Sequence, residues 1–225
     1  MSNKQNIVTI DGPAGVGKST VSRKVAAATG FTYLDTGAMY RGVGLYLQEE
    51  KIDLGDRERL IAHLETLKLE LFPGKTEDDD VGVLLNGRDV SSIIRTAEMA
   101  MVASEVSAIP AVRDILTKMQ RNYGEKGKIV AEGRDTGTVV FPDAAYKFFL
   151  DAKPEERARR RVDQLRIKGE VAEYEDILAM TIERDKNDRE RNIAPLKQAS
   201  DAVGIDTTEI DVTEVVKQIL GLVIK

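Results

Sequence analysis

A glycine-rich stretch from Asn6 to Thr20 constrains this chain more than any other part of it. The stretch opens with a β-rich run, and after Lys18 and Ser19 its apolar residues recur at helical spacing. Gly12, Gly17, Lys18 and Ser19 match the pattern G-x-x-x-x-G-K-[ST] between a strand and a helix, the context that this phosphate-binding motif requires. The sequence therefore predicts an α/β fold whose first strand and first helix flank a phosphate-binding loop.

The residue types in this loop suit a phosphate group. Glycines let the backbone pass close to a phosphate with its N–H groups pointing inward, and the helix N-terminus adds positive potential there. Lys18 can reach β- and γ-phosphates, and the Ser19 hydroxyl can bind Mg²⁺. A glycine-rich turn that merely starts a helix is the alternative, but the spacing and both flanking elements disfavour it.

Composition limits the class of protein. The 225 residues suffice for one α/β core with an inserted part, or for two small domains. The formal net charge of −5 provides no global field to attract nucleic acid, and the absence of cysteine excludes disulfides, thiolate metal sites and a cysteine nucleophile. The chain does not open on an apolar signal region, and no apolar run is long enough to span a membrane. We therefore expect a cytoplasmic protein.

The next segment continues the α/β pattern. Residues 31–35 read as a second strand, and Thr36 is predicted to cap the helix that follows. Arg41 lies in the first turns of that helix, where a cation opposes the helix dipole unless an anion is bound nearby. A surface arginine with an acidic partner is the simpler alternative.

An antiparallel insertion follows. A strand near 68–72 and a hairpin signal at Asn86-Gly87 do not belong in a parallel α/β chain, so 68–106 is predicted to be an inserted subdomain. The acidic run at 77–80 is most simply a solvated loop, and metal binding is the poorer alternative.

The second half supplies further candidates. Two helices are expected between 96 and 123, meeting at Pro110, followed by a short buried strand at 129–131. Residues 132–135 come directly after that strand, where open α/β sheets place their ligands. Another strand is expected at 146–152.

The basic segment 153–168 reads as a helix. It is interpretable as a solvated helix with a Glu156–Arg160 pair, as a nucleic-acid patch or as a mobile phosphate clamp; the acidic net charge and the lack of interleaved aromatic residues disfavour the nucleic-acid patch. A helix from about Tyr174 should place Arg184, Asp188 and Arg191 on one face. A last strand ends near Asp206, and the closing helix should bury Val212, Val215, Val216, Ile219 and Leu222.

Four stretches make the chain resemble the bacterial cytidylate kinases, which are nucleoside monophosphate kinases. They are ITIDGPAGVGKST, YLDTGAMYR, EGRDTGTVVFPDA with the following KFFLDA…EERARRR, and ERDKNDRERNIAPL. Together they span nearly the whole chain, and the last three are more specific to this family than the phosphate-binding loop.

The resemblance implies one P-loop kinase domain over 1–225, with a three-layer core around a parallel sheet. The monophosphate-binding region would cover about 36–110, including the insert at 68–106, and a lid would cover about 152–170. The activity implied is ATP-dependent phosphorylation of CMP and dCMP to CDP and dCDP by in-line phosphoryl transfer, with Mg²⁺.

The resemblance also implies residue roles. For ATP these are Gly12, Pro13, Ala14, Gly15, Val16, Gly17, Lys18, Ser19 and Thr20, with Arg157, Arg160 and Arg161 of the lid, and Ser19 as the metal ligand. Arg41 and Arg134 would hold the CMP phosphate, near Tyr40 and Thr36. Ser104, Arg113 and Asp135 would read the cytosine, and Arg184, Asp188 and Arg191 would meet the ribose and the acceptor phosphate. Lys18, Arg134, Arg184, Asp188 and Arg191 would be the catalytic set.

The chain departs from the family pattern in two conservative ways. Thr36 stands where the family often has serine, which keeps the hydroxyl, and Glu132 stands where it often has aspartate, which keeps the charge.

Rival functions remain at this point. Another small-molecule P-loop kinase, acting on UMP, AMP or shikimate, is the near rival. A GTPase-type switch is disfavoured because no N-K-x-D motif is present and the D-x-x-G match at Asp79–Gly82 lies in the insert. A nucleic-acid-binding module is disfavoured by the acidic charge. We expect a monomer without nucleic-acid or membrane partners.

Overall fold

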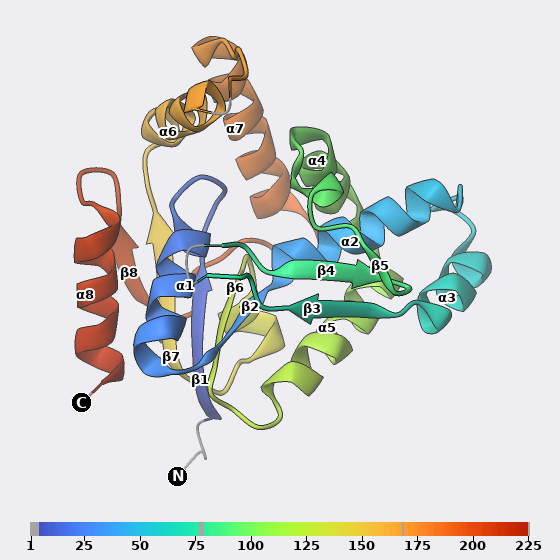
Figure 1. The fold of residues 1–225 in the computed structure, drawn as a ribbon, viewed down its shortest axis with the longest axis horizontal. Coiled ribbons are helices and arrows are strands. Elements are labelled where there is room, and N and C mark those ends of the chain that lie inside the picture. The colour runs from blue at the N-terminus through green and yellow to red at the C-terminus, as the bar shows by residue number, and fades with distance from the viewer. Residues whose placement is uncertain (1–4, 77–78, 168, 225) are drawn as a thin grey trace.

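The computed structural model describes residues 5–76, 79–167 and 169–224. A five-stranded sheet forms its centre, in the order β2-β6-β1-β7-β8, with every neighbouring pair parallel (Figure 1). Its strands are β1 (Gln5–Asp11), β2 (Thr32–Asp35), β6 (Ile129–Gly133), β7 (Ala144–Asp151) and β8 (Val203–Asp206). The predicted parallel α/β core is therefore confirmed.

Apolar residues on both faces of the sheet explain its three layers. Val8 and Ile10 of β1 pack in a cluster with α1 (Lys18–Thr29) and α8 (Val212–Val223), which lie side by side (Figure 1). Ile7, on the opposite face, belongs to a second cluster with α2 (Thr36–Glu49) and α5 (Pro110–Gly124). Val215 and Ile219 of α8 are buried as predicted, Val212 and Val216 are only partly buried, and Leu222, in the last turn of the helix, is 39% exposed.

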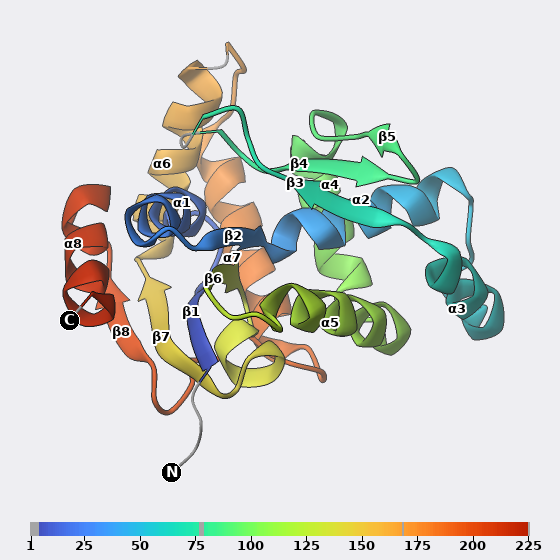
Figure 2. The same cartoon turned by 60° about the horizontal axis from the view of Figure 1, so that its bottom comes forward.

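The insert forms its own antiparallel sheet in the order β3-β4-β5. These strands are Leu69–Phe72, Gly82–Leu85 and Arg88–Asp89, and α3 (Arg57–Thr66) precedes them. Asn86 and Gly87 have φ of 50° and 81°, the left-handed values that a tight hairpin of this kind needs. The predicted hairpin is thus confirmed, and Figure 2 shows this sheet beside α2 and away from β7 and β8. The short helix η1 (Ile93–Arg95) and α4 (Ala97–Val106) complete the region.

Two helices stand above the carboxyl ends of the parallel strands. α6 (Pro154–Ile167) and α7 (Tyr174–Glu190) pack against each other there (Figure 1). Arg184 and Asp188 lie within α7, whereas Arg191 is its C-terminal capping residue. Among the described residues, no helix is both long and apolar enough to cross a membrane.

Candidate active site

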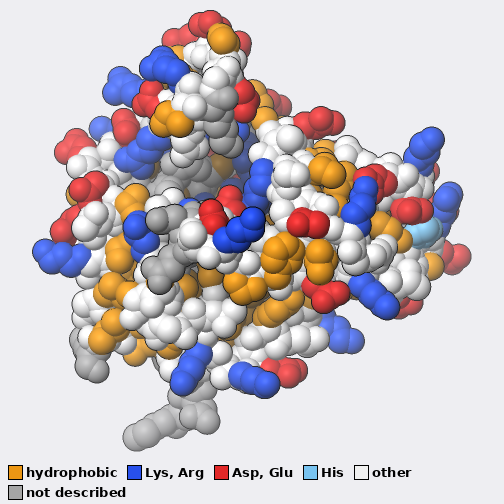
Figure 3. Space-filling model, in the orientation of Figure 1, with side chains coloured by type: hydrophobic (Ala, Val, Ile, Leu, Met, Phe, Trp, Pro, Cys, Tyr) orange, Lys and Arg blue, Asp and Glu red, His pale blue; other side chains and the backbone are white. Residues whose placement is uncertain are grey.

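The register of the parallel sheet brings the functional segments to one edge. Asp35 of β2 pairs with Glu132 of β6, and Asp11 of β1 pairs with Gly133, so three strand ends meet at the same level. A cleft of 1020 Å³ opens there, between the strand ends and the α6–α7 projection. In Figure 3, Lys and Arg side chains are visible on that projection and around the hollow beneath it.

Most of the predicted site residues line this cleft. They are Ala14, Gly15, Val16, Gly17, Lys18, Ser19, Thr20, Thr36, Tyr40, Arg41, Ser104, Arg134, Asp135, Arg160, Arg161, Arg184, Asp188 and Arg191. The other four, Gly12, Pro13, Arg113 and Arg157, are buried and do not line it.

The glycine loop between β1 and α1 has the backbone that its sequence predicts. Gly12, Gly15 and Gly17 have φ of 151°, 81° and 91°, a range that glycine tolerates best. A Cβ at Gly12 would lie 2.0 Å from the carbonyl oxygen of Leu150, so β7 itself excludes any side chain there. Lys18 Nζ donates a hydrogen bond of 2.6 Å to the Pro13 carbonyl across the loop.

Lys18 lies in an electrostatically unfavourable position. Its side chain is buried, and burial lowers its pKa well below the usual value. The positive charges of Arg134 and Arg184 lower that pKa further, while Glu132 and Asp11 oppose the shift. A polyanion bound in the loop would relieve this repulsion.

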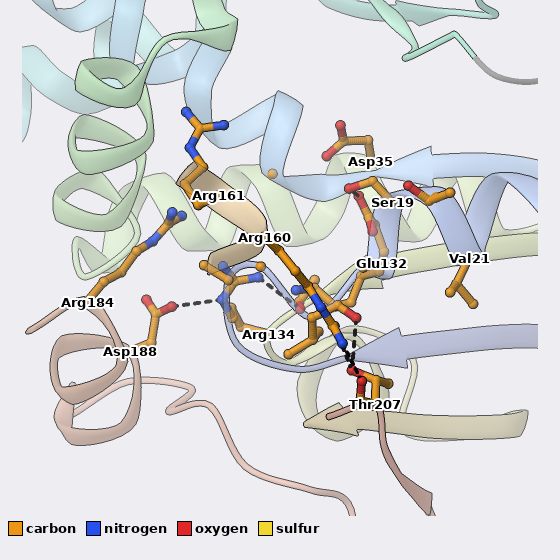
Figure 4. A pocket seen from close by; sticks show the side chains of 18 of the residues that line it. Ser19, Val21, Asp35, Glu132, Arg134, Arg160, Arg161, Arg184, Asp188 and Thr207 are labelled. Carbon is orange, nitrogen blue, oxygen red and sulfur yellow. Dashed lines mark hydrogen bonds and ion pairs between the residues drawn. The ribbon is translucent and has the colours of Figure 1, made fainter. Parts of the chain in front are cut away.

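One carboxylate oxygen of Glu132 accepts hydrogen bonds from two hydroxyl groups. Ser19 Oγ and Tyr33 OH each donate a hydrogen bond of 2.7 Å to Glu132 Oε1. Glu132 Oε2 is buried and has no hydrogen-bond partner among the described residues. Burial, followed by repulsion from Asp35, raises the pKa of Glu132. Figure 4 shows Ser19 beside Glu132 in the cleft, and this pair of oxygen donors fits a hard cation such as Mg²⁺.

The start of α2 differs from prediction in its cap. Asp35, not Thr36, is the N-cap, and its carboxylate accepts a hydrogen bond of 2.8 Å from the Ala38 amide. Thr36 is the first helical residue, and its hydroxyl donates to the Glu132 carbonyl at 2.6 Å, which ties α2 to β6.

Two arginines meet at Asp35. Arg41 and Arg95 donate to Asp35 Oδ2 at 3.3 and 3.0 Å. Burial alone would raise the pKa of Asp35, but the two guanidinium groups hold it below its usual value. Arg41 Nε is buried and has no hydrogen-bond partner within the described part of the chain. Arg41 therefore lies in the cleft with donor capacity to spare.

Sequence reasoning missed Arg95 and Asp80, which also line the cleft. Asp80 forms ion pairs with Arg95 and with Arg23 of α1, and so connects the insert to the first helix. Asp80 belongs to the acidic loop predicted to be solvated, and its side chain is 46% exposed, so the prediction holds for this residue, although it also forms ion pairs that the sequence did not indicate. Residues 77 and 78 lie outside the described residues. Nothing local in the sequence marks this contact, because Arg23 and Asp80 are 57 residues apart.

Arg134 and α7 form a second charged group. Arg134 Nε donates to Asp188 Oδ2 at 2.8 Å (Figure 4), and Ser104 Oγ donates to Asp188 Oδ1 at 3.4 Å. Burial would raise the pKa of Asp188, but Arg134 holds it below the usual value. Burial, and then Arg134, lowers the pKa of Arg184 to about 10. Arg184 Nε is buried with no hydrogen-bond partner among the described residues, as a group awaiting an anion would be.

Asp135 lies between two other arginines. Arg113 donates to Asp135 Oδ2, and Arg191 donates to Asp135 Oδ1 at 3.4 Å. Arg113 is buried behind Asp135, and its guanidinium lies 5.8 Å from the ring centre of Tyr40. Asp135 and Tyr40 both line the cleft, and Arg113 supports them from the protein interior.

Asp11, also missed from the sequence, fixes the turn that follows Asp135. Its carboxylate accepts hydrogen bonds from the amides of Thr136 and Gly137 at 2.9 and 2.7 Å, and from the Thr136 hydroxyl at 2.8 Å. These contacts anchor the short π-helical turn η2 (Thr136–Val140) to β1. Burial outweighs the three hydrogen bonds and raises the pKa of Asp11 to about 6.

The arginines of the basic helix α6 differ in their placement: some line the cleft and one is buried. Arg160 donates to the Thr207 carbonyl at 2.6 Å (Figure 4), so it and residues 207–212 border the same end of the cleft. Arg161 also lines the cleft. Arg157 is only 2% exposed and instead bonds to Asp185 and to the carbonyl of Ala14.

Comparison with known proteins supplies the family. A family model described as cytidylate kinase matches residues 8–225. A cytidylate kinase of Carboxydothermus hydrogenoformans is 45% identical over 96% of both chains, and one of Fervidobacterium nodosum is 48% identical over 96% of this chain and 95% of its own. A solved structure of an uncharacterized protein from Eubacterium ventriosum shares the fold, with a TM-score of 0.52, 14% identity and 98% of each chain covered. The P-loop, the arginine-lined cleft and these similarities together establish that the chain belongs to the cytidylate kinase family.

Proposed function

We propose that this chain is an ATP-dependent kinase that phosphorylates CMP, and dCMP, to the diphosphate. One observation carries the proposal: Lys18 on the glycine loop shares a single cleft with Arg41, Arg134, Arg184 and Arg191. Phosphoryl transfer needs positioning and charge neutralisation more than a nucleophilic side chain, and the cleft supplies both.

The donor nucleotide would lie on the P-loop side. The loop amides from Gly12 to Thr20 would surround the phosphates, and Lys18 would leave the Pro13 carbonyl for the β- and γ-phosphates. Arg160 and Arg161 of α6 would lie over the nucleotide, next to residues 207–212. Arg157 would not contact the nucleotide directly but would hold the loop in place by its hydrogen bond to the Ala14 carbonyl.

The cation would be held by Ser19, with Glu132 accepting from one of its water ligands. A bound Mg²⁺ would neutralise charge on the phosphates as the bond to the leaving group breaks. The buried, unpartnered Glu132 Oε2 supports this placement.

The acceptor would occupy the opposite side. Arg41 and Arg134 would hold its phosphate, since a guanidinium fits a phosphate through paired N–H groups, with Thr36 and Tyr40 at the edge of the pocket. Asp188 keeps Arg134 turned toward the cleft, and Arg184, Asp188 and Arg191 would meet the ribose and the transferring group.

Cytosine would be read around Asp135 and Ser104. A carboxylate accepts a hydrogen bond from the amino group of cytosine and repels the carbonyl that uracil has there. Arg113 would reach the base only after a rearrangement, since it now supports Asp135 from behind. The α6–α7 projection and the insert would exclude water, which would otherwise accept the phosphoryl group.

Release of ADP from ATP, measured over a panel of nucleoside monophosphates, tests the proposal. We expect strong stimulation by CMP and dCMP, weak stimulation by UMP and AMP, and none by shikimate. Slow ATP hydrolysis that ignores every monophosphate would contradict it. We also propose that the active species is a monomer, which size-exclusion chromatography with light scattering will check.

A further inference from the structure

Tyr33 contributes a hydroxyl group to the cation side of the cleft although its ring lies outside the cleft lining. It sits on β2, the edge strand, opposite Val130 of β6, and its side chain is partly buried. Its hydroxyl reaches Glu132 Oε1 at 2.7 Å, the same oxygen to which Ser19 donates at the same distance. One carboxylate oxygen of Glu132 therefore accepts hydrogen bonds from Tyr33 on β2 and from Ser19 on α1.

We infer that Tyr33 is a positioning residue for the divalent cation: its hydroxyl fixes the Glu132 carboxylate so that Oε1 holds the Ser19 hydroxyl and Oε2 stays free for the cation's water. The inference rests on the proposed Mg²⁺ site at Ser19.

The chemistry of the two hydroxyl groups supports this role. Ser19 donates its only hydroxyl proton to Glu132, so the lone pairs of its Oγ remain available to a cation. Tyr33, which also donates, adds a second restraint on the same oxygen and leaves the other oxygen unpartnered within the described residues. Outer groups that orient metal ligands in this way usually matter for metal affinity.

The length of Glu132 explains why a second restraint is useful. A glutamate carboxylate can turn about three side-chain torsions, and the last of these is broad. One hydrogen bond from Ser19 would leave the plane of the carboxylate free to rotate about the bonded oxygen, so the direction of the second oxygen would vary. With Tyr33 also bound to Oε1, rotation away from the observed orientation would break two hydrogen bonds to a buried group, which is unfavourable.

A purely structural role for the hydroxyl predicts something different. The Tyr33–Glu132 hydrogen bond would then only stabilise the contact between β2 and β6, and its loss would lower the melting temperature without changing cation binding. The two roles therefore separate on metal affinity.

The test is Tyr33→Phe, which removes the hydroxyl and keeps the ring. Free Mn²⁺ is measured by electron paramagnetic resonance in the presence of protein and a non-hydrolysable ATP analogue, with the analogue alone as the reference, because its phosphates bind Mn²⁺ without protein. Tyr146→Phe is the matched control, because Tyr146 lies partly buried on β7 of the same sheet and outside the lining of the cleft. We expect Tyr33→Phe to weaken Mn²⁺ binding about tenfold, with unchanged binding of CMP and of the analogue in EDTA, and Tyr146→Phe to match wild type. Wild-type Mn²⁺ affinity in Tyr33→Phe would overturn the inference.

A double-mutant cycle keeps the test valid if Tyr33→Phe also loses stability. In Glu132→Asp the carboxylate is one methylene shorter and withdraws from Tyr33, so adding Tyr33→Phe should weaken Mn²⁺ binding by less than about twofold further. A full additional loss in that background would show that Tyr33 acts without Glu132, and would overturn the inference. If the wild-type protein with the ATP analogue holds Mn²⁺ no more tightly than the analogue alone, the proposed cation site itself fails. If the wild type holds Mn²⁺ more tightly and Tyr33→Phe matches it, only the role of Tyr33 fails.

Discussion

Arg157 donates one hydrogen bond to each carboxylate oxygen of Asp185, at 2.9 and 2.5 Å. The same guanidinium donates to the carbonyls of Ala14 and Ala152, at 3.1 and 3.0 Å. One buried arginine thus joins α7, the P-loop and the start of α6. Because Asp185 is adjacent to Arg184, these hydrogen bonds of Arg157 fix the position of Arg184 relative to the P-loop.

We therefore expect Asp185→Asn to be costly. Removing one partner leaves the buried charge of Arg157 without its counter-charge, which typically costs about 3–5 kcal/mol. Urea denaturation measures the loss, and Glu214→Gln serves as the control, because its pair with Lys217 has exposed side chains and should contribute less than about 1 kcal/mol. If both substitutions lowered the free energy of unfolding equally, the Arg157–Asp185 pair would not have that stabilising role.

Lys18→Met and Lys18→Ala should both reduce kcat by at least about 100-fold, since each removes the cation expected at the β- and γ-phosphates. Neither should unfold the protein, because Lys18 is a desolvated cation repelled by Arg134 and Arg184. Lys18→Met keeps most of the aliphatic packing, so it separates loss of charge from loss of volume. Steady-state kinetics and thermal melting check both statements, and near-native turnover in a folded variant would contradict the P-loop assignment.

Asp135→Ala should narrow the preference for CMP over UMP. Opposed polar groups in a closed site cost about 1–3 kcal/mol each, so the ratio of the two kcat/KM values should fall by roughly 10- to 100-fold. The loss should come from CMP, with UMP spared. Asp135→Asn is the companion variant, because its amide can donate to the carbonyl of uracil while keeping the side-chain shape. Equal losses for both nucleotides would remove Asp135 from base recognition.

Stability should depend on pH through Asp11. Its folded-state pKa of about 6 exceeds the ordinary value of 3.8, so the folded protein binds this proton more tightly than the unfolded chain does. The resulting stabilisation is complete below pH 3.8 and is lost as the pH rises through 6; a shift of this size corresponds to about 3 kcal/mol. Asp11→Asn cannot titrate, so the difference in unfolding free energy between it and wild type should change between pH 4 and 7. A difference that stays constant over that range would contradict the assignment.

Local sequence explains how much of this architecture could be predicted. The P-loop could be predicted because its motif lies in one short, continuous stretch of sequence. The hairpin could be predicted because Asn86 and Gly87, two adjacent residues, both tolerate left-handed backbone. Strand ends could be placed because parallel strands share an edge, and the family resemblance added that Lys18, Arg41 and Arg134 share one site; all three line the same cleft.

Long-range pairing explains the rest. Asp35 and Thr36 are both good capping residues, and in the fold the Thr36 hydroxyl donates to the carbonyl of Glu132, 96 residues away, while Asp35 caps the helix. The arginines of α6 look equivalent in sequence, but only Arg157 of them is paired with Asp185, 28 residues further along the described chain, and Arg157 is buried. Such choices are made by partners that periodicity and spacing do not identify.

The crowding of Lys18, Arg134 and Arg184 has a consequence for the lifetime of the protein. Glu132, Asp11 and Asp188 offset only part of the repulsion among these cations, so a bound polyanion should stabilise the folded protein further. A ligand that binds only the folded state lowers the unfolded fraction by the factor 1 + [L]/Kd. Proteases act on the unfolded chain, and a cell short of nucleotide would therefore degrade this enzyme faster than a cell with abundant nucleotide.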